Sequence, residues 1–258
     1  MANAHGEFIW YELMTPDPDA SKAFYDSVVG WTIGDKPSQG MDYRMIAAAD
    51  GFVGGVLALN ADMVAGGAVP GWMGYFGVDD VDATVAAIVA AGGQVHLPAS
   101  DIPDVGRIAM VSDPQGVAIY VMRGASDEAS AAYGRHAMGH VSWNELQTTD
   151  DAAALAFYDT HFDIKKVGAM EMGEMGDYSF IANSEGGEAI GAVMKAMPGV
   201  RPGWGFYFRV PGIEAAKARI EQAGGTVTHG PMDVPGGEMV LNAIDPQGAL
   251  FGLVAPGK

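Results

Sequence analysis

Short apolar runs separated by turn residues dominate the chain, and four stretches change to helical spacing. The runs "FIWYELM" (8–14) and "GWMGYFGV" (71–78) are rich in aromatic residues and are typical of strands. The stretch "DPDASKAFYDSVVG" (17–30) begins with Asp and Pro, ends with Gly, and places apolar residues at helical intervals. This pattern predicts a helix over about 19–29, and similar patterns predict helices over about 80–92, 151–161 and 212–224.

The turn Asp-Pro-Gln-Gly occurs twice, each time between two apolar runs. It lies in "MVSDPQGVAIYVM" (110–122) and in "NAIDPQGALFGLV" (242–254). Proline at the second position fixes φ, and glycine at the fourth suits a tight turn. We therefore expect a β-hairpin at each site. The two Asp residues, Asp113 and Asp245, are 132 positions apart (245 − 113) in a chain of 258 residues.

Much of the rest of the chain repeats with an offset of 132 or 133 positions. Three blocks match in the same order, namely 8–26 with 141–159, 70–95 with 202–227, and 101–116 with 233–248. A repeat of this extent indicates a tandem duplication. Strand, helix and then strands occur twice in each copy, which gives four units. We expect one domain over 1–124, a linker rich in Ala, Ser and Gly over 125–139, and a second domain over 140–258.

At these residues the sequence resembles the vicinal oxygen chelate superfamily of glyoxalases, extradiol dioxygenases and bleomycin-resistance proteins. The resemblance rests on three patterns found in both copies. An Asp after the first strand precedes Phe-Tyr by seven residues, a helix ends in Ala-Gly-Gly, and Asp-Pro-Gln-Gly precedes an apolar strand. The resemblance implies an α+β fold of two glyoxalase-like domains. Four βαβββ units would form two curved, half-open sheets, each around a ligand cavity.

In metal-dependent relatives, the resemblance implies His and Glu ligands on the first and last strands of these units. Counting from the matching Asp residues places other residues there, namely Trp10, Trp143, Met73, Gly205, Tyr120 and Gly252. Indole, thioether and glycine do not hold a hard divalent cation. We therefore expect no cofactor and no divalent metal at these positions.

Alternation along a strand shows which side chains share a face with these positions. Trp10, Glu12 and Met14 should point together, as should Trp143, Glu145 and Gln147. The predicted ligand-binding set is Trp10, Glu12, Tyr75, Tyr120, Trp143, Glu145, Tyr207 and Arg209. An aromatic pocket with a few polar groups is typical of a small-molecule site. No catalytic residue is assigned.

Each of these side chains also has a purely structural interpretation. The two tryptophans could fill a closed cavity, and the two glutamates could be salt-bridged or solvated at a sheet rim. The tyrosines could be packing residues. His136 and His140 have the spacing of a metal clamp on a helix, but they lie in or beside the expected linker, which favours a structural role.

The amino-acid composition limits the kinds of partner that the protein is expected to bind. There are 32 Asp+Glu against 14 Lys+Arg, giving a net charge of −18, which disfavours nucleic acid and anionic membranes. The chain has no Cys, which excludes disulfides and a cysteine nucleophile. We expect neither a signal peptide nor a membrane span, and we expect a cytoplasmic monomer or homodimer.

Three functions remain open at this point. The first is a metal-independent binder of a small, aromatic or apolar molecule. The second is an enzyme of the same superfamily (a lyase, isomerase or dioxygenase) with a relocated metal site. The third is an interaction protein that acts through its surface. The aromatic face favours the first, and the sequence does not identify the ligand.

Overall fold

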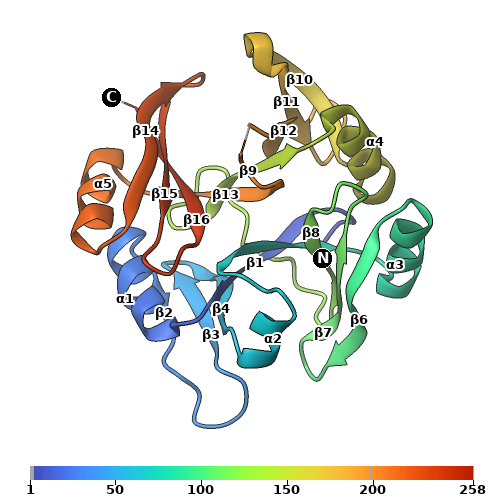
Figure 1. Ribbon diagram of the computed structural model, residues 1–258, viewed down its shortest axis with the longest axis horizontal. Coiled ribbons are helices and arrows are strands. Elements are labelled where there is room, and N and C mark those ends of the chain that lie inside the picture. Colours follow the sequence, from blue (N-terminus) through green and yellow to red (C-terminus); the bar gives the residue numbers. More distant parts are fainter. Residues whose placement is uncertain (1–2, 198, 258) are drawn as a thin grey trace. The chain divides into compact units, whose positions relative to one another are not determined.

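The computed structural model describes residues 3–197 and 199–257, and its elements follow the duplicated sequence (Figure 1). The elements of the first half are β1 (Phe8–Thr15), α1 (Pro18–Val28), β2 (Thr32–Ile33), β3 (Tyr43–Ala48), β4 (Gly51–Ala58), α2 (Ala61–Ala65), β5 (Gly71–Gly77), α3 (Val81–Ala90), β6 (Gln94–Ile102), β7 (Gly106–Ser112) and β8 (Ala118–Gly124). Those of the second half are β9 (Val141–Thr148), α4 (Asp151–Phe162), β10 (Lys165–Glu171), the 3-10 turn η1 (Gly173–Met175), β11 (Asp177–Ala182), β12 (Gly191–Lys195), β13 (Gly203–Arg209), α5 (Ile213–Gln222), β14 (Thr226–Val234), β15 (Glu238–Ile244) and β16 (Leu250–Pro256).

The four expected helices are confirmed, and three of them begin at an aspartate cap. The carboxylates of Asp17, Asp80 and Asp150 each accept a hydrogen bond from the backbone N–H three residues later. Such a cap satisfies one of the donors that the first helical turn leaves unpaired. The fourth helix, α5, follows Gly212 and has no side-chain cap.

Both halves form eight-stranded sheets with corresponding strand orders. The orders are β2-β3-β4-β1-β5-β8-β7-β6 and β10-β11-β12-β9-β13-β16-β15-β14. The two Asp-Pro-Gln-Gly hairpins are confirmed, because β7 pairs antiparallel with β8 and β15 with β16. The expected α+β fold of four related units is confirmed, although the sequence patterns did not predict β2, β6, β10, β14 or the short α2.

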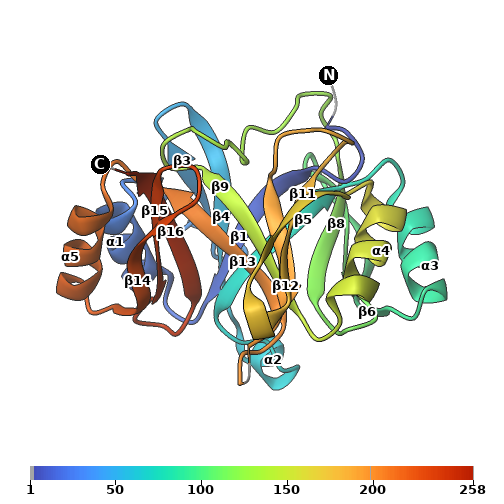
Figure 2. The same ribbon diagram turned by 90° about the horizontal axis from the view of Figure 1, so that it is seen from above.

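The compact units of the molecule combine pieces of both halves. Unit 1 contains residues 1–9, 73–130 and 143–204, and unit 2 contains 10–72, 131–142 and 205–258. In unit 1, α3 lies beside α4, and in unit 2, α1 lies beside α5 (Figure 2). Each helix pair therefore joins one helix from each copy of the repeat. Residues 131–139 of the expected linker belong to unit 2.

Aromatic side chains fill the interior of each unit. In unit 1, Phe76 of β5 stacks on Phe162 of α4, with ring centroids 4.4 Å apart. In unit 2, Tyr25 of α1 packs against Phe251 of β16, with centroids 5.4 Å apart. All four side chains are buried, so burial of their apolar surface stabilises the pairing of the two copies.

Candidate functional site

Four side chains form a hydrogen-bonded set on the second half's sheet, within unit 1. The Trp143 indole N–H donates to the Tyr178 hydroxyl at 2.8 Å. That hydroxyl donates to Glu145 Oε2, also at 2.8 Å. Gln147 Nε2 donates to the other carboxylate oxygen at 3.2 Å. Trp143, Glu145 and Gln147 are all partly exposed, whereas Asn144 and Leu146 between them are buried, as the expected alternation requires.

The first half has the corresponding residues in unit 2. The Trp10 indole N–H donates to the Tyr43 hydroxyl at 2.7 Å. Glu12 is on the same face of β1 but is only 2% exposed. Its partner on the neighbouring strand β4 is Gly55. A Cβ at Gly55 would lie 2.1 Å from the Tyr43 hydroxyl oxygen. The tyrosine therefore occupies the space that a side chain at position 55 would need.

The three tyrosines of the predicted set pack against other groups of the protein itself. In unit 1, the rings of Tyr75 and Tyr120 stack with centroids 4.3 Å apart and an interplanar angle of 11°. In unit 2, the ring of Tyr207 lies over Gly252, where a Cβ would be 2.3 Å from Tyr207 Cδ1. Asn242 Nδ2 donates to the Tyr207 hydroxyl at 2.9 Å. These buried tyrosines shape the sheet faces.

Comparison with known proteins identifies the family. The family model for the Glyoxalase/Bleomycin resistance protein/Dioxygenase superfamily matches residues 7–121 and 137–253. The chain belongs to this superfamily. It is similar to CFP32 of Mycobacterium tuberculosis (strain CDC 1551 / Oshkosh), which is named as a glyoxylase. The identity is 34% over 257 residues, covering 96% of this chain and 94% of that protein.

Two further matches are a second relative and a solved structure of similar fold. The anthracycline biosynthesis protein DnrV of Streptomyces peucetius is 30% identical over 270 residues, covering 97% of this chain and 94% of that protein. The crystal structure of the Mn(II)-bound glyoxalase from Novosphingobium aromaticivorans is similar in fold. Its TM-score is 0.67 at 16% identity, covering 98% of this chain and 83% of that one.

The residues at the superfamily's metal-ligand positions do not fit a divalent ion. The indole nitrogens of Trp10 and Trp143 carry hydrogen and donate it to tyrosine hydroxyls, so they offer no lone pair. Tyr120 is stacked on Tyr75, and Gly252 has no donor side chain. Within 3–197 and 199–257, no three His, Asp or Glu side chains lie where they could share a metal ion.

Arg209, a member of the predicted ligand-binding set, forms part of an ion-pair cluster in unit 2. Its Nη2 donates to Glu238 Oε1 and approaches His136 Nδ1 at 3.3 Å. Arg135 pairs with the second oxygen of Glu238 at 3.4 Å. The Arg209 side chain is 5% exposed. It therefore ties the segment 131–142 to β13 and β15.

His140 has a structural environment as well. Its Nδ1 lies 2.6 Å from the Ala131 carbonyl oxygen, and its Nε2 lies 2.8 Å from Asp50 Oδ1. Nearby, the Trp31 indole donates to the Gly139 carbonyl oxygen at 2.6 Å. These contacts support the structural role that the sequence favoured for His140.

The repeated Asp-Pro-Gln-Gly turn joins the two copies. Asp113 Oδ1 accepts the backbone N–H groups of Gln115 and Val117 within its own turn, each at 2.9 Å. Its Oδ2 accepts the hydroxyl of Tyr158, from α4, at 3.2 Å. In unit 2, Asp245 accepts the hydroxyl of Tyr25, from α1, at 3.1 Å. Each turn thus binds a helix that belongs to the other copy.

Burial changes the titration of these pairs. It raises the pKa of the Asp113 and Asp245 carboxyls, because a charged carboxylate is poorly solvated inside the protein, although the hydrogen bonds oppose the shift. Burial and the nearby carboxylate also raise the pKa of Tyr25 and Tyr158. The tyrosines therefore remain protonated donors.

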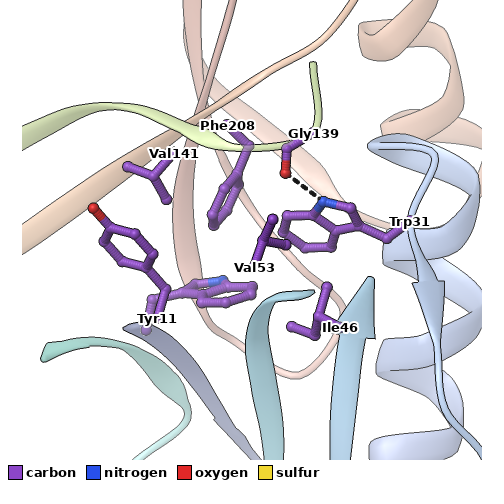
Figure 3. Close-up of a pocket in the computed structure, with 8 residues that line it drawn as sticks. Tyr11, Trp31, Ile46, Val53, Gly139, Val141 and Phe208 are labelled. Carbon is purple, nitrogen blue, oxygen red and sulfur yellow. Dashed lines mark hydrogen bonds between the residues drawn. The ribbon is translucent and has the colours of Figure 1, made fainter. Parts of the chain in front are cut away.

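A crevice on the opposite face of β1 is filled by the protein itself (Figure 3). Phe208 packs edge-on against the indole of Trp31, with ring centroids 4.8 Å apart, and that indole donates to the Gly139 carbonyl oxygen. The crevice lies in unit 2 and leaves no space for a water molecule. Its lining residues are Tyr11, Trp31, Ile46, Val53, Trp72, Gly139, Val141 and Phe208. It is a packing seam and holds no ligand in this conformation.

Two site residues were missed by the sequence prediction. Tyr43 and Tyr178 each receive the indole hydrogen bond of a predicted tryptophan. A signal for both was present, since each follows an aspartate at the start of the third strand of its copy, in "DYRM" and "DYSF". The predicted ligand-binding set itself stays a prediction.

Proposed function

We propose that the protein binds a small planar aromatic molecule on the Trp143–Tyr178–Glu145 face of its sheet, without a metal ion, in the cytoplasm. The observation that carries the proposal is this hydrogen-bonded set. The Tyr178 hydroxyl holds the edge of the Trp143 indole in place, and Trp143 remains partly exposed. A fixed, accessible aromatic surface favours planar ligands, and an offset stack contributes roughly 0.5–1.5 kcal/mol beyond burial.

Membership of the superfamily supports a small-molecule ligand, and the name of DnrV supports an aromatic one. That relative is named for anthracycline biosynthesis, and anthracyclines contain planar fused rings. The misfit of the metal-ligand positions favours binding over the metal-dependent chemistry of the superfamily. A superfamily enzyme with a relocated metal site is the alternative.

The test uses 2-naphthol as a fluorescent planar probe, with wild-type protein and the double variant Trp10→Ala/Trp143→Ala. We expect saturable binding by the wild type and at least tenfold weaker binding by the double variant, with circular dichroism unchanged. If the two tryptophan side chains only fill space in the cavity, their removal should leave binding of the probe unchanged or make it stronger. Elemental analysis for Fe, Mn, Ni and Zn completes the test, because a stoichiometric metal would favour the enzyme alternative.

A further inference from the structure

The two copies of the Trp–Tyr–Glu set differ in their access to solvent. Glu145 is partly exposed in the second copy, whereas Glu12 is 2% exposed in the first. The next position on each face also differs, being Gln147 in the second copy and Met14 in the first. Duplication started the copies from one sequence, so these differences identify where the copies have diverged.

The two copies also differ by one methyl group beside this glutamate. Glu12 is next to Gly55 on the neighbouring parallel strand, and Glu145 is next to Ala192 at the matching position. Without a Cβ at Gly55, the Tyr43 hydroxyl settles onto the sheet beside Glu12. The methyl group of Ala192 occupies the matching place, so the Tyr178 hydroxyl bonds to Glu145 without settling onto the sheet there, and Glu145 is partly exposed.

Building on the proposed function, we infer that the second copy alone is the working site, and that it selects neutral planar aromatics carrying a hydroxyl or amino hydrogen. An ionised carboxylate accepts hydrogen bonds and donates none. Glu145 already accepts the Tyr178 hydroxyl and the Gln147 amide, and any ligand atom that meets it must also be a donor. An anionic ligand is repelled by Glu145 and by the net charge of −18.

Gln147 reinforces this preference. Its amide nitrogen faces the carboxylate at 3.2 Å, which fixes the orientation of the amide, because the reverse orientation would place two acceptors together. Gln147 thereby keeps the Glu145 side chain aligned. Met14 cannot do the same for Glu12.

Three naphthalenes that share one ring system test the ligand class. These are 2-naphthol, 2-methoxynaphthalene, which lacks the donor hydrogen, and the anion 2-naphthoate. We expect the wild type to bind one 2-naphthol per chain, about tenfold tighter than 2-methoxynaphthalene, with no binding of 2-naphthoate at the same concentrations. Glu145→Gln should remove the preference for 2-naphthol. The control Glu171→Gln makes the same charge change at an exposed position of unit 1 and should leave the preference intact.

A reciprocal exchange tests which copy works. Ala192→Gly should let Tyr178 close over Glu145 and weaken 2-naphthol binding at least tenfold. Gly55→Ala should displace Tyr43 and raise the stoichiometry from one to two. Two sites in the wild type, or an equal affinity for 2-naphthol and its methyl ether, would overturn the inference while leaving the proposed function intact. No binding of any uncharged naphthalene would overturn both. Glu145→Gln preserves side-chain volume and decides the matter if Ala192→Gly does not fold.

Discussion

Each copy of the repeat contains a corresponding buried polar network, and the two networks differ by a single hydroxyl group. In unit 2, Thr15 Oγ1 and Ser21 Oγ lie 2.9 Å apart, and Ser21 donates to Gln247 Oε1 at 3.3 Å. In unit 1, Ala154 takes the place of Ser21. The matching acceptors, Thr148 Oγ1 and Gln115 Oε1, are buried without a hydrogen-bond partner among the described residues. Unsatisfied buried polar groups cost roughly 1–3 kcal/mol each.

Ala154→Ser should therefore stabilise the protein. The new hydroxyl can serve both orphaned atoms, and the gain exceeds the small loss of helix propensity. We expect the free energy of unfolding to rise by about 1 kcal/mol in urea denaturation. The matched variant Ser21→Ala should lower it by a similar amount. No gain in Ala154→Ser would mean that water already satisfies these atoms.

The pH dependence of stability can be predicted from Asp42. The buried Arg44 donates to both oxygens of this carboxylate, at 2.8 and 3.1 Å. These hydrogen bonds lower the pKa of Asp42 below the ordinary value of 3.8. Because the folded-state pKa is depressed, the stabilisation is complete above about pH 4 and is lost as pH falls through the lower folded-state value.

Asp42→Asn should lower the free energy of unfolding at pH 7 by about 1.5–3 kcal/mol, the usual range for hydrogen bonds to charged groups. The difference from wild type should shrink as pH falls below about 4, since the wild-type carboxylate then becomes protonated. Urea titrations between pH 2.5 and 7 measure this. Asp35→Asn, at an exposed position, is the control for charge removal. A constant difference across this range would contradict the assignment.

At the scale of the element, helix α5 lacks the aspartate side-chain cap that begins α1, α3 and α4. Gly212 precedes α5 with extended backbone (φ −165°), and a Cβ there would meet open space. An aspartate can cap α5 as Asp80 caps α3, and it also reduces the entropy of the unfolded chain. We expect Gly212→Asp to stabilise by about 1 kcal/mol and Asp80→Ala to destabilise by about the same. Thermal unfolding measures both, and a lower Tm for Gly212→Asp would exclude the capping geometry.

Helices and hairpins could be predicted from the sequence because their signals are local. Asp17, Asp80 and Asp150 mark helix starts, and Asp-Pro-Gln-Gly fixes a turn within four residues. Strand β6 escaped prediction because Pro98 interrupts its short run, and a proline within a run argues against a strand. The roles of Tyr43 and Tyr178 depend on contacts with strands more than 30 residues away. Arg209 was placed on the correct strand, but its ion pair with Glu238 depends on the packing of β15.

At the scale of the whole molecule, the repeats match the sequence, but the compact units do not follow its halves. Unit 2 combines α1, from residues 18–28, with β14–β16, from residues 226–256. Hydrogen bonds connect these distant segments. Tyr25 donates to Asp245, 220 positions away, and Trp72 donates to the Tyr25 hydroxyl at 3.0 Å. The beginning and end of the chain should therefore unfold together.

Tyr25→Phe tests this cooperativity. The variant keeps the aromatic packing and removes only the hydroxyl, which leaves Asp245 Oδ2 without its donor and Trp72 Nε1 without its acceptor. We expect a loss of roughly 1–3 kcal/mol in the free energy of unfolding. In hydrogen exchange, the amides of α1 and of β15–β16 should lose protection by the same amount, because one cooperative unit opens as a whole. Tyr158→Phe should act in the same way on α4 and on β7–β8 of unit 1, through Asp113.

A different result would contradict this prediction. If Tyr25→Phe accelerated exchange in α1 alone, with β15–β16 as protected as in the wild type, the C-terminal strands would be a separate folding unit. The two repeats would then unfold independently of each other.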